Sequence, residues 1–159
     1  MGPLGRSDLL TQGGRIRSAR SAGRRERTIN DAGSTTDADA VLAANQAFYD
    51  AFEAADLDAM SALWEHSERV ACTHPGWATL RGWGGIVASW YAIFQNPQRL
   101  QFILTEPFAL AEGDVGWVTV NENLLDGQLG STVAALNVFI RTESGWLMVA
   151  HHGSPVMRS

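Results

Sequence analysis

The sequence lacks a second cysteine, a long apolar run and any lysine, and the first two absences limit where the protein can work. Cys72 is the only cysteine among the 159 residues, so no intramolecular disulfide can form and a cytoplasmic location is expected. No stretch approaches the roughly 18 apolar residues of a membrane-spanning helix, and the N-terminus lacks the apolar segment of a secretory signal. We therefore expect no association with a membrane.

The motifs that identify a bound cofactor are also missing. The chain holds no glycine-rich phosphate loop, no hydrolase nucleophile elbow and no dinucleotide fingerprint. It has no closely spaced metal ligands of the kind H-x-x-x-H or C-x-x-C. If the protein is an enzyme, we expect it to work without a cofactor and without a metal ion.

Aromatic residues are absent from the N-terminal part of the chain, since all fourteen lie at or beyond Phe48. Residues 1–36 hold seven arginines against three acids, a balance of +4, whereas the remainder carries −9, which together give the formal net charge of −5. A segment with so few apolar side chains cannot offset its ordering entropy. We predict a disordered, arginine-rich tail over 1–36 and one folded domain over 37–159. Nucleic-acid binding by the tail is the disfavoured alternative, because no aromatic interleaves its charges and the domain is acidic.

The apolar spacing predicts helices first and strands last. A helix capped by Thr36 or Asp37 runs to about Ala54, and a shorter one opens at Asp56 and Asp58. The later elements are a strand over 69–74, a helix over 82–94, and strands over 100–111, 115–125, 131–142 and 146–152. Short turns favour antiparallel neighbours, so we expect an α+β fold in which a curved antiparallel sheet wraps round the N-terminal helices. Such a cone can hold a small molecule in its mouth.

Several short motifs resemble the nuclear transport factor 2-like superfamily, and within it the SnoaL-like domains. They are Asp56-Leu57-Asp58, Gly82, Gly145-Trp146, His74-Pro75-Gly76-Trp77, Ser89-Trp90, Asn137-Val138-Phe139 and His151-His152-Gly153-Ser154-Pro155. The resemblance covers about residues 37–157 and implies a cone-shaped, usually dimeric fold with an interior pocket. This superfold hosts isomerases, cyclases, dehydratases, epoxide hydrolases and non-catalytic association modules, so the fold does not choose a function.

Ketosteroid isomerase, an enzyme of this fold, has counterparts here at two of its three functional positions. His74 before Pro75 stands where that enzyme has its general-base aspartate. Asn137 stands where it has an oxyanion-hole aspartate, and an amide donates a hydrogen bond at any pH. Phe48 replaces the oxyanion tyrosine, which argues against steroid isomerisation. Tyr49 is one position away and points about 100° round the helix.

Glu122 is the unexpected residue of its strand. Alternation places it on the face of the apolar Val118 and Val120, so a carboxylate is buried if that face points inward. Burial raises a carboxyl pKa and makes the group usable as an acid or base at pH 7. The alternatives are a structural pair with Arg69, Arg81 or a protonated histidine, or a strand whose faces are reversed.

His151 and His152 are consecutive on a strand, so only one of them can point inward, and the pattern does not choose between them. His74, one of this pair and Glu122 would match a metal-binding set in residue type, but without close spacing we expect none. Cys72 shares a strand face with His74, where an inert buried thiol is favoured over a reactive pair.

These residues predict a pocket for a small apolar or aromatic molecule. Trp77, Trp90 and Tyr49 are its expected walls, with His151 and His152 as further ligand-binding candidates. The favoured reaction is proton transfer next to a carbonyl, as in an isomerase, cyclase or dehydratase. His74 would be the base, Asn137 the oxyanion donor and Glu122 a second acid or base. The alternative is a non-catalytic module that dimerises or carries a ligand.

Overall fold

The computed structural model describes residues 31–97, 100–125 and 131–157. Most of the predicted tail, residues 1–30, lies outside the described residues. The first helix begins at Asp31, earlier than the expected cap at Thr36 or Asp37. The helices and strands are α1 (Asp31–Ala54), α2 (Leu57–Leu63), β1 (Ala71–Thr73), β2 (Leu80–Arg81), α3 (Trp83–Phe94), β3 (Phe102–Glu112), β4 (Val115–Leu124), β5 (Thr132–Thr142) and β6 (Gly145–Pro155).

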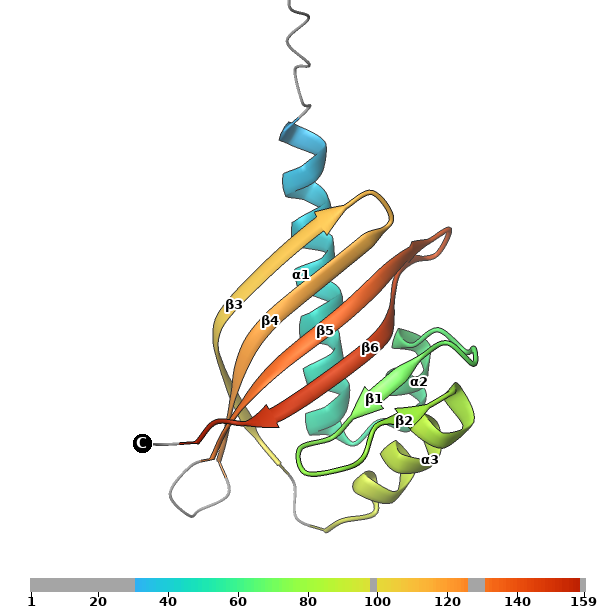
Figure 1. The fold of residues 1–159 in the computed structure, drawn as a ribbon, viewed down its shortest axis with the longest axis vertical. Coiled ribbons are helices and arrows are strands. Elements are labelled where there is room, and N and C mark those ends of the chain that lie inside the picture. The colour runs from blue at the N-terminus through green and yellow to red at the C-terminus, as the bar shows by residue number, and fades with distance from the viewer. Residues whose placement is uncertain (1–30, 98–99, 126–130, 158–159) are drawn as a thin grey trace, which may run out of the picture.

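A sharp corner separates α1 from α2. Ala55 has a φ of 51°, a left-handed conformation that ends α1. Asp56 then caps α2, because its carboxylate accepts a hydrogen bond from the Ala59 backbone N–H at 2.9 Å. The predicted start of the second helix is therefore confirmed, and the corner turns α2 away from the axis of α1 (Figure 1).

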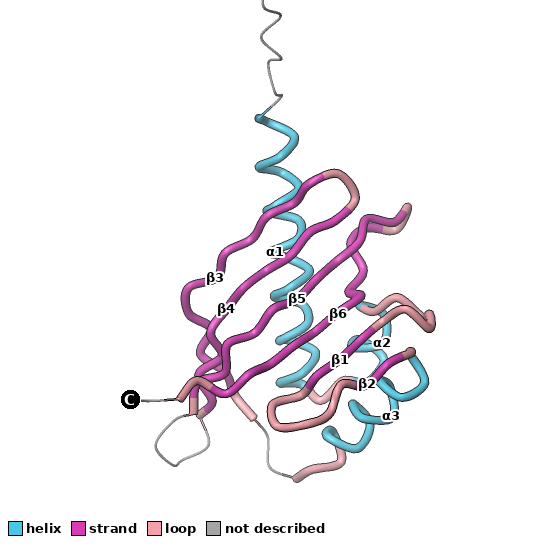
Figure 2. The backbone as a smooth tube through the Cα atoms, in the orientation of Figure 1, coloured by secondary structure: helices cyan, strands magenta, loops and turns pink. Residues whose placement is uncertain are grey.

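Six strands form one sheet in the order β2-β1-β6-β5-β4-β3. The predicted antiparallel pairing holds for every neighbouring pair except β1 and β6, which run parallel. The strand β2 was not predicted, because two residues are too short to give an alternating pattern. A bulge between Thr105 and Phe108, with Glu106 at a φ of 55°, bends the outer strand β3 (Figure 2).

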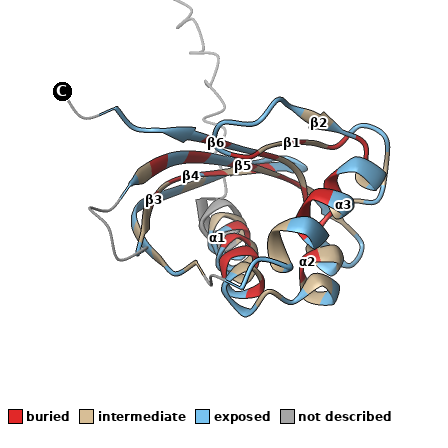
Figure 3. Cartoon of the chain, turned by 90° about the horizontal axis from the view of Figure 1, so that it is seen from below, coloured by how far each residue is buried: buried red, intermediate tan, exposed pale blue. Residues whose placement is uncertain are grey.

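All three helices lie on one side of this sheet, with α1 along its concave face (Figure 3). Alternate residues of β4 and β5 point toward α1, and Val118, Val120 and Phe139 are buried between the layers. The fold is therefore an α+β cone, as predicted. None of the helices in the described part of the chain is long and apolar enough to cross a bilayer. The expected cytoplasmic location stays a prediction.

Candidate functional site

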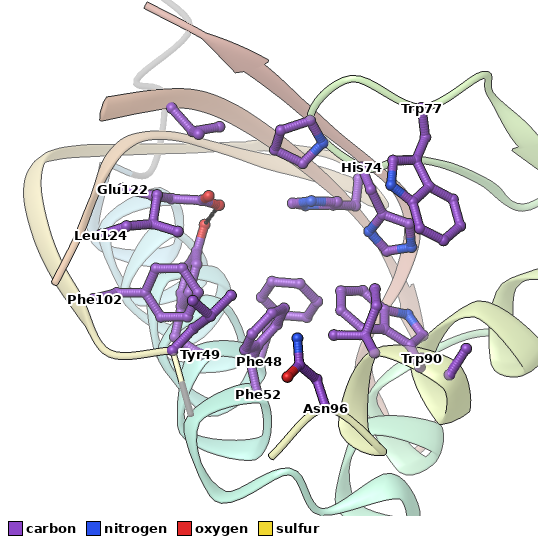
Figure 4. Close-up of a pocket in the computed structure, with 16 residues that line it drawn as sticks. Phe48, Tyr49, Phe52, His74, Trp77, Trp90, Asn96, Phe102, Glu122 and Leu124 are labelled. Carbon is purple, nitrogen blue, oxygen red and sulfur yellow. Dashed lines mark hydrogen bonds between the residues drawn. The ribbon is translucent and has the colours of Figure 1, made fainter. Parts of the chain in front are cut away.

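A cavity of about 460 Å³ lies between the concave face of the sheet, α1 and α3. This size suits a small organic ligand. Its walls combine aromatic and aliphatic side chains with a few polar groups (Figure 4). The lining residues are Phe48, Tyr49, Phe52, His74, Pro75, Trp77, Trp90, Ala92, Ile93, Asn96, Leu100, Phe102, Glu122, Leu124, Val133 and His151.

Glu122 enters the cavity from β4 on the face that its alternation predicts. The residue is only 5% exposed, and its Oε1 accepts a hydrogen bond from the Tyr49 hydroxyl at 2.7 Å. Burial raises the pKa of the Glu122 carboxyl to about 7, against the opposing effect of that hydrogen bond. Neither candidate arginine is its partner, since Arg69 bonds Glu65 at 2.6 Å and Arg81 is exposed. The carboxyl therefore lies in the cavity with a neutral partner.

Tyr49 reaches the polar end of the cavity from α1. Its neighbour Phe48 also lines the cavity, because the cone surrounds enough of the helix for two adjacent side chains to face it. Burial, and the negative charge of Glu122, raise the pKa of the Tyr49 phenol far above its usual value. The hydroxyl thus keeps its proton at any ordinary pH and acts as a donor.

Asn137 lies behind this pair and not on the cavity wall. Its Nδ2 donates to Asn45 Oδ1 at 2.7 Å and more weakly to the Tyr49 hydroxyl at 3.4 Å, and its Oδ1 lies 2.6 Å from His151 Nδ1. Both amide hydrogens are therefore used inside the protein. Asn137 is not among the described residues that line the cavity, and its amide bonds to Asn45 on α1 and His151 on β6, which differs from the predicted ligand-facing oxyanion donor.

The structure chooses between the two consecutive histidines. His151 is buried against the cavity, whereas His152 is exposed on the outer face of the sheet, where it lines a separate groove. Of the two candidates that the sequence leaves open, His151 lines the cavity and His152 does not. A shift in register between β5 and β6 leaves Val149 unpaired, so Met148 and His151 are buried on one face despite their odd spacing.

His74 lies at the end of β1, on the opposite side of the cavity from Glu122 (Figure 4). Its Nε2 is 2.9 Å from the Ser89 hydroxyl, which in turn donates to the Ile86 carbonyl at 2.7 Å. Burial lowers the pKa of the His74 imidazole to about 4. The ring is therefore neutral at physiological pH and is held in one orientation by α3.

Cys72 is fully buried beside His74. Burial raises the pKa of its thiol to about 12, so it carries no thiolate near neutral pH. The favoured interpretation, an inert thiol, agrees with this environment. Within residues 31–97, 100–125 and 131–157, no group of three or more His, Cys, Asp or Glu side chains is arranged to hold a metal ion.

The aromatic wall is larger than the sequence indicates. Trp90 is fully buried and packs edge-on against His74, with ring centroids 4.6 Å apart, while Trp77 is 49% exposed at the mouth. Phe52 and Phe102 also line the cavity, and their centroids are 4.9 Å apart. Phe52 follows Phe48 by one helical turn, a spacing that could have identified it. Phe102 reaches the site through tertiary contacts that no local pattern reports.

Comparison with known proteins agrees with this architecture. Residues 41–158 match the model of the SnoaL-like domain. Over 119 residues the chain is 29% identical to the F-box protein SKIP8 of Arabidopsis thaliana, covering 74% of this chain and 50% of that protein. The chain thus spans about half the length of the curated relative it matches.

Solved structures give the same fold. A "putative dehydratase from the NTF2-like family" of Streptomyces avermitilis is 39% identical, covers 78% of this chain and 99% of its own, and superposes with a TM-score of 0.72. A "putative calcium/calmodulin-dependent protein kinase type II association domain" of Thiobacillus denitrificans is 36% identical, with coverages of 73% and 94% and a TM-score of 0.68. The cone and its cavity define an NTF2-like protein. More narrowly, this chain belongs to the SnoaL-like domain family.

Proposed function

We propose that this domain binds a small, largely apolar carbonyl compound and transfers a proton next to the carbonyl without a cofactor. The observation that carries the proposal is the Tyr49–Glu122 pair in an aromatic cavity, a carboxyl with a pKa of about 7 beside a phenol that keeps its proton. A base is most effective when its pKa lies near the working pH. The Streptomyces avermitilis relative, with its dehydratase name, supports the same reaction class.

In this mechanism Glu122 is the base. It removes a proton from the carbon next to the carbonyl, and the electron pair of that C–H bond moves into the enolate. Once Glu122 is protonated it no longer needs the Tyr49 hydroxyl as a donor, so Tyr49 can donate to the enolate oxygen. The negative charge moves from the Glu122 carboxylate to the substrate oxygen. The Tyr49 hydroxyl can therefore donate first to the carboxylate and then to the enolate oxygen. Glu122 then returns the proton to another carbon, which completes an isomerisation, or gives it to a hydroxyl group that leaves as water when the enolate electrons expel it, which completes a dehydration.

His74 takes a smaller role than the resemblance implies. A base with a pKa of about 4 has little driving force to take a proton from carbon, whereas Glu122 is matched to neutral pH. The neutral ring instead orients the substrate from the opposite wall. Asn137 acts through others, because its contacts with Asn45, Tyr49 and His151 fix the closed end of the cavity.

Proton exchange in D₂O tests the reaction before the natural substrate is known. Pocket-sized ketones are incubated with the protein, and loss of the proton next to the carbonyl is followed by NMR. We expect Glu122→Gln to slow exchange by about 10²- to 10⁴-fold and Tyr49→Phe by about 10²-fold. Glu112→Gln and Tyr91→Phe are matched controls on exposed residues that do not line the cavity. Full exchange in Glu122→Gln, or no exchange with any such ketone, would favour a non-catalytic ligand carrier.

We further propose that the domain forms a homodimer through the outer face of the sheet. The register places Phe108, Leu110 and Leu136 on the face of Thr119, opposite the helices, and all three are exposed. No helix in the described part of the chain covers this face (Figure 1). Several large apolar side chains exposed on one uncovered face favour an interface there. Sedimentation should show a dimer that Leu136→Arg dissociates and Tyr91→Arg on α3 does not, and a monomeric parent protein at about 50 μM would contradict it.

A further inference from the structure

In each histidine of the cavity one ring nitrogen has an oxygen partner within 2.9 Å, and that partner determines which nitrogen carries the proton. At His74 the partner is Ser89, whose single hydroxyl proton goes to the Ile86 carbonyl at 2.7 Å. The Ser89 oxygen can then only accept from His74 Nε2, 2.9 Å away. His74 is therefore protonated at Nε2, and its Nδ1 holds a lone pair.

His151 is held in the opposite tautomer. Asn137 Nδ2 donates to Asn45, which fixes the amide orientation and leaves Asn137 Oδ1 as an acceptor for His151 Nδ1 at 2.6 Å. The proton of His151 is therefore on Nδ1, and its Nε2 holds the lone pair. Two rings whose centroids are 6.3 Å apart thus each contribute an acceptor and no spare N–H.

Burial keeps both rings in this neutral form. It lowers the pKa of His74 to about 4 and the pKa of His151 to about 3. For His151, the neighbouring His74 and His152 lower the pKa further. The thiol of Cys72 is the competing donor for the His74 lone pair, with its sulfur 3.9 Å from Nδ1 and 3.8 Å from Nε2. An S–H is a weak donor and this contact is long, so an N–H or O–H of a ligand is the stronger partner for that lone pair.

The other donors near the cavity are bonded within the protein, closed off by burial, or located at the mouth. The Tyr49 hydroxyl donates to Glu122. The indole N–H of Trp90 has no hydrogen-bond partner in the described structure, but its nitrogen is fully buried and does not reach the open cavity. Trp77 and Asn96 lie at the exposed mouth. No arginine is among the described residues that line the cavity. Its interior therefore offers lone pairs, a carboxyl and aromatic faces.

We propose that the cavity takes an aromatic ligand without negative charge that carries an N–H or O–H donor, directed at His74 Nδ1 and His151 Nε2. This proposal rests on the proposed function in one respect, because both place the ligand in the same cavity. A donor satisfies lone pairs that an apolar ligand would leave buried and unpaired. An anion would meet the Glu122 carboxylate and two lone pairs with no cation to balance it.

Binding of matched ring compounds tests the ligand class. Indole has one N–H donor, benzofuran has the same shape without it, and indole-2-carboxylate adds a negative charge. Titration calorimetry at pH 8 should show indole binding at least about fivefold more tightly than benzofuran. Indole-2-carboxylate should bind more weakly than both. Equal or tighter binding of benzofuran, or tightest binding of the carboxylate, would overturn the proposal.

The tautomers are tested independently. ¹⁵N spectra of the imidazoles should show His74 protonated at Nε2 and His151 at Nδ1, and the reverse assignment would overturn the proposal. Ser89→Ala removes the partner that selects the His74 tautomer, so the preference for indole over benzofuran should fall, while Ser154→Ala on the outer face should leave it unchanged. An unaltered preference in Ser89→Ala would contradict the role of His74. These binding and ¹⁵N measurements need no turnover. A failed exchange experiment therefore overturns the proton-transfer function but not the ligand class. A failed binding experiment overturns the ligand class but not the proton-transfer function.

Discussion

The Tyr49 hydroxyl and the Glu122 carboxylate are 73 positions apart in the sequence and 2.7 Å apart in the cavity. The helix α1 supplies the donor and β4 supplies the acceptor, so the pair exists only when the sheet has curled round the helix. Because a phenol and a carboxyl share one hydrogen bond in an apolar cavity, the protonation of Glu122 decides where the Tyr49 proton points. This coupling connects the stability of the fold with the proposed chemistry.

Glu122→Gln should stabilise the protein at pH 8 and change little at pH 4. The pKa of Glu122 is raised from 4.5 to about 7 in the folded protein, so the folded state holds its proton more tightly than the unfolded chain. The free energy of unfolding therefore falls as pH rises between these two values, and the loss is complete above pH 7. Glutamine keeps an oxygen for Tyr49 without the charge, so we expect a gain of about 1–3 kcal/mol at pH 8. Urea unfolding at several pH values measures it, and a variant with an unchanged pH profile would refute the buried-charge effect.

Asn137→Ala should be among the most destabilising polar substitutions in the domain. The change leaves Asn45, Tyr49 and His151 each short of a buried hydrogen-bond partner. We expect a loss of about 2–4 kcal/mol from these unpaired groups. Asn121→Ala on the outer face is the matched control, since it loses only a hydrogen bond to the exposed Glu106 and should cost less than about 1 kcal/mol. Thermal unfolding of both variants compares them, and equal losses would contradict the importance of this network.

The sequence predicts the parts of this site that depend on local periodicity. Alternation along β4 is regular, so it places Glu122 on the buried face, and helical spacing places Phe48 and Tyr49 near the core. The Asp56 cap is likewise a local signal. Glu122 lies where the sequence predicts because β4 keeps a regular alternation. Phe48 and Tyr49 do so because α1 is continuous around them.

Other parts of the site depend on contacts that no local pattern encodes. The orientation of Asn137 is set by Asn45, 92 positions away, and the inward direction of His151 depends on the unpaired Val149 two residues before it. Ser89 carries no periodic signal for its bond to His74. Family resemblance identified Asn137 as important, but its contacts inside the protein changed its role.

Cys72 should resist alkylation in the folded protein. Its thiol is fully buried and its pKa is raised to about 12, so almost no thiolate is present at pH 8. Mass spectrometry after treatment with iodoacetamide should find the native protein unmodified and the urea-unfolded protein fully modified. Rapid modification without denaturant would show that β1 opens readily or that the thiol is activated by His74.

Gly116→Ala should destabilise the domain, whereas Gly85→Ala should not. A Cβ at Gly116 would collide with Val41 Cγ2 and come within 3.3 Å of Trp146, both held between α1 and the sheet. Overpacking of this kind costs about 1–3 kcal/mol. A Cβ at Gly85 meets nothing within 4 Å on the surface of α3, and alanine there should stabilise the helix by about 0.5–1 kcal/mol. Val41→Ala combined with Gly116→Ala should recover part of the loss because it removes the colliding methyl groups. If Gly116→Ala unfolds at the same urea concentration as the parent protein, α1 does not pack as closely on β4 as the structure indicates.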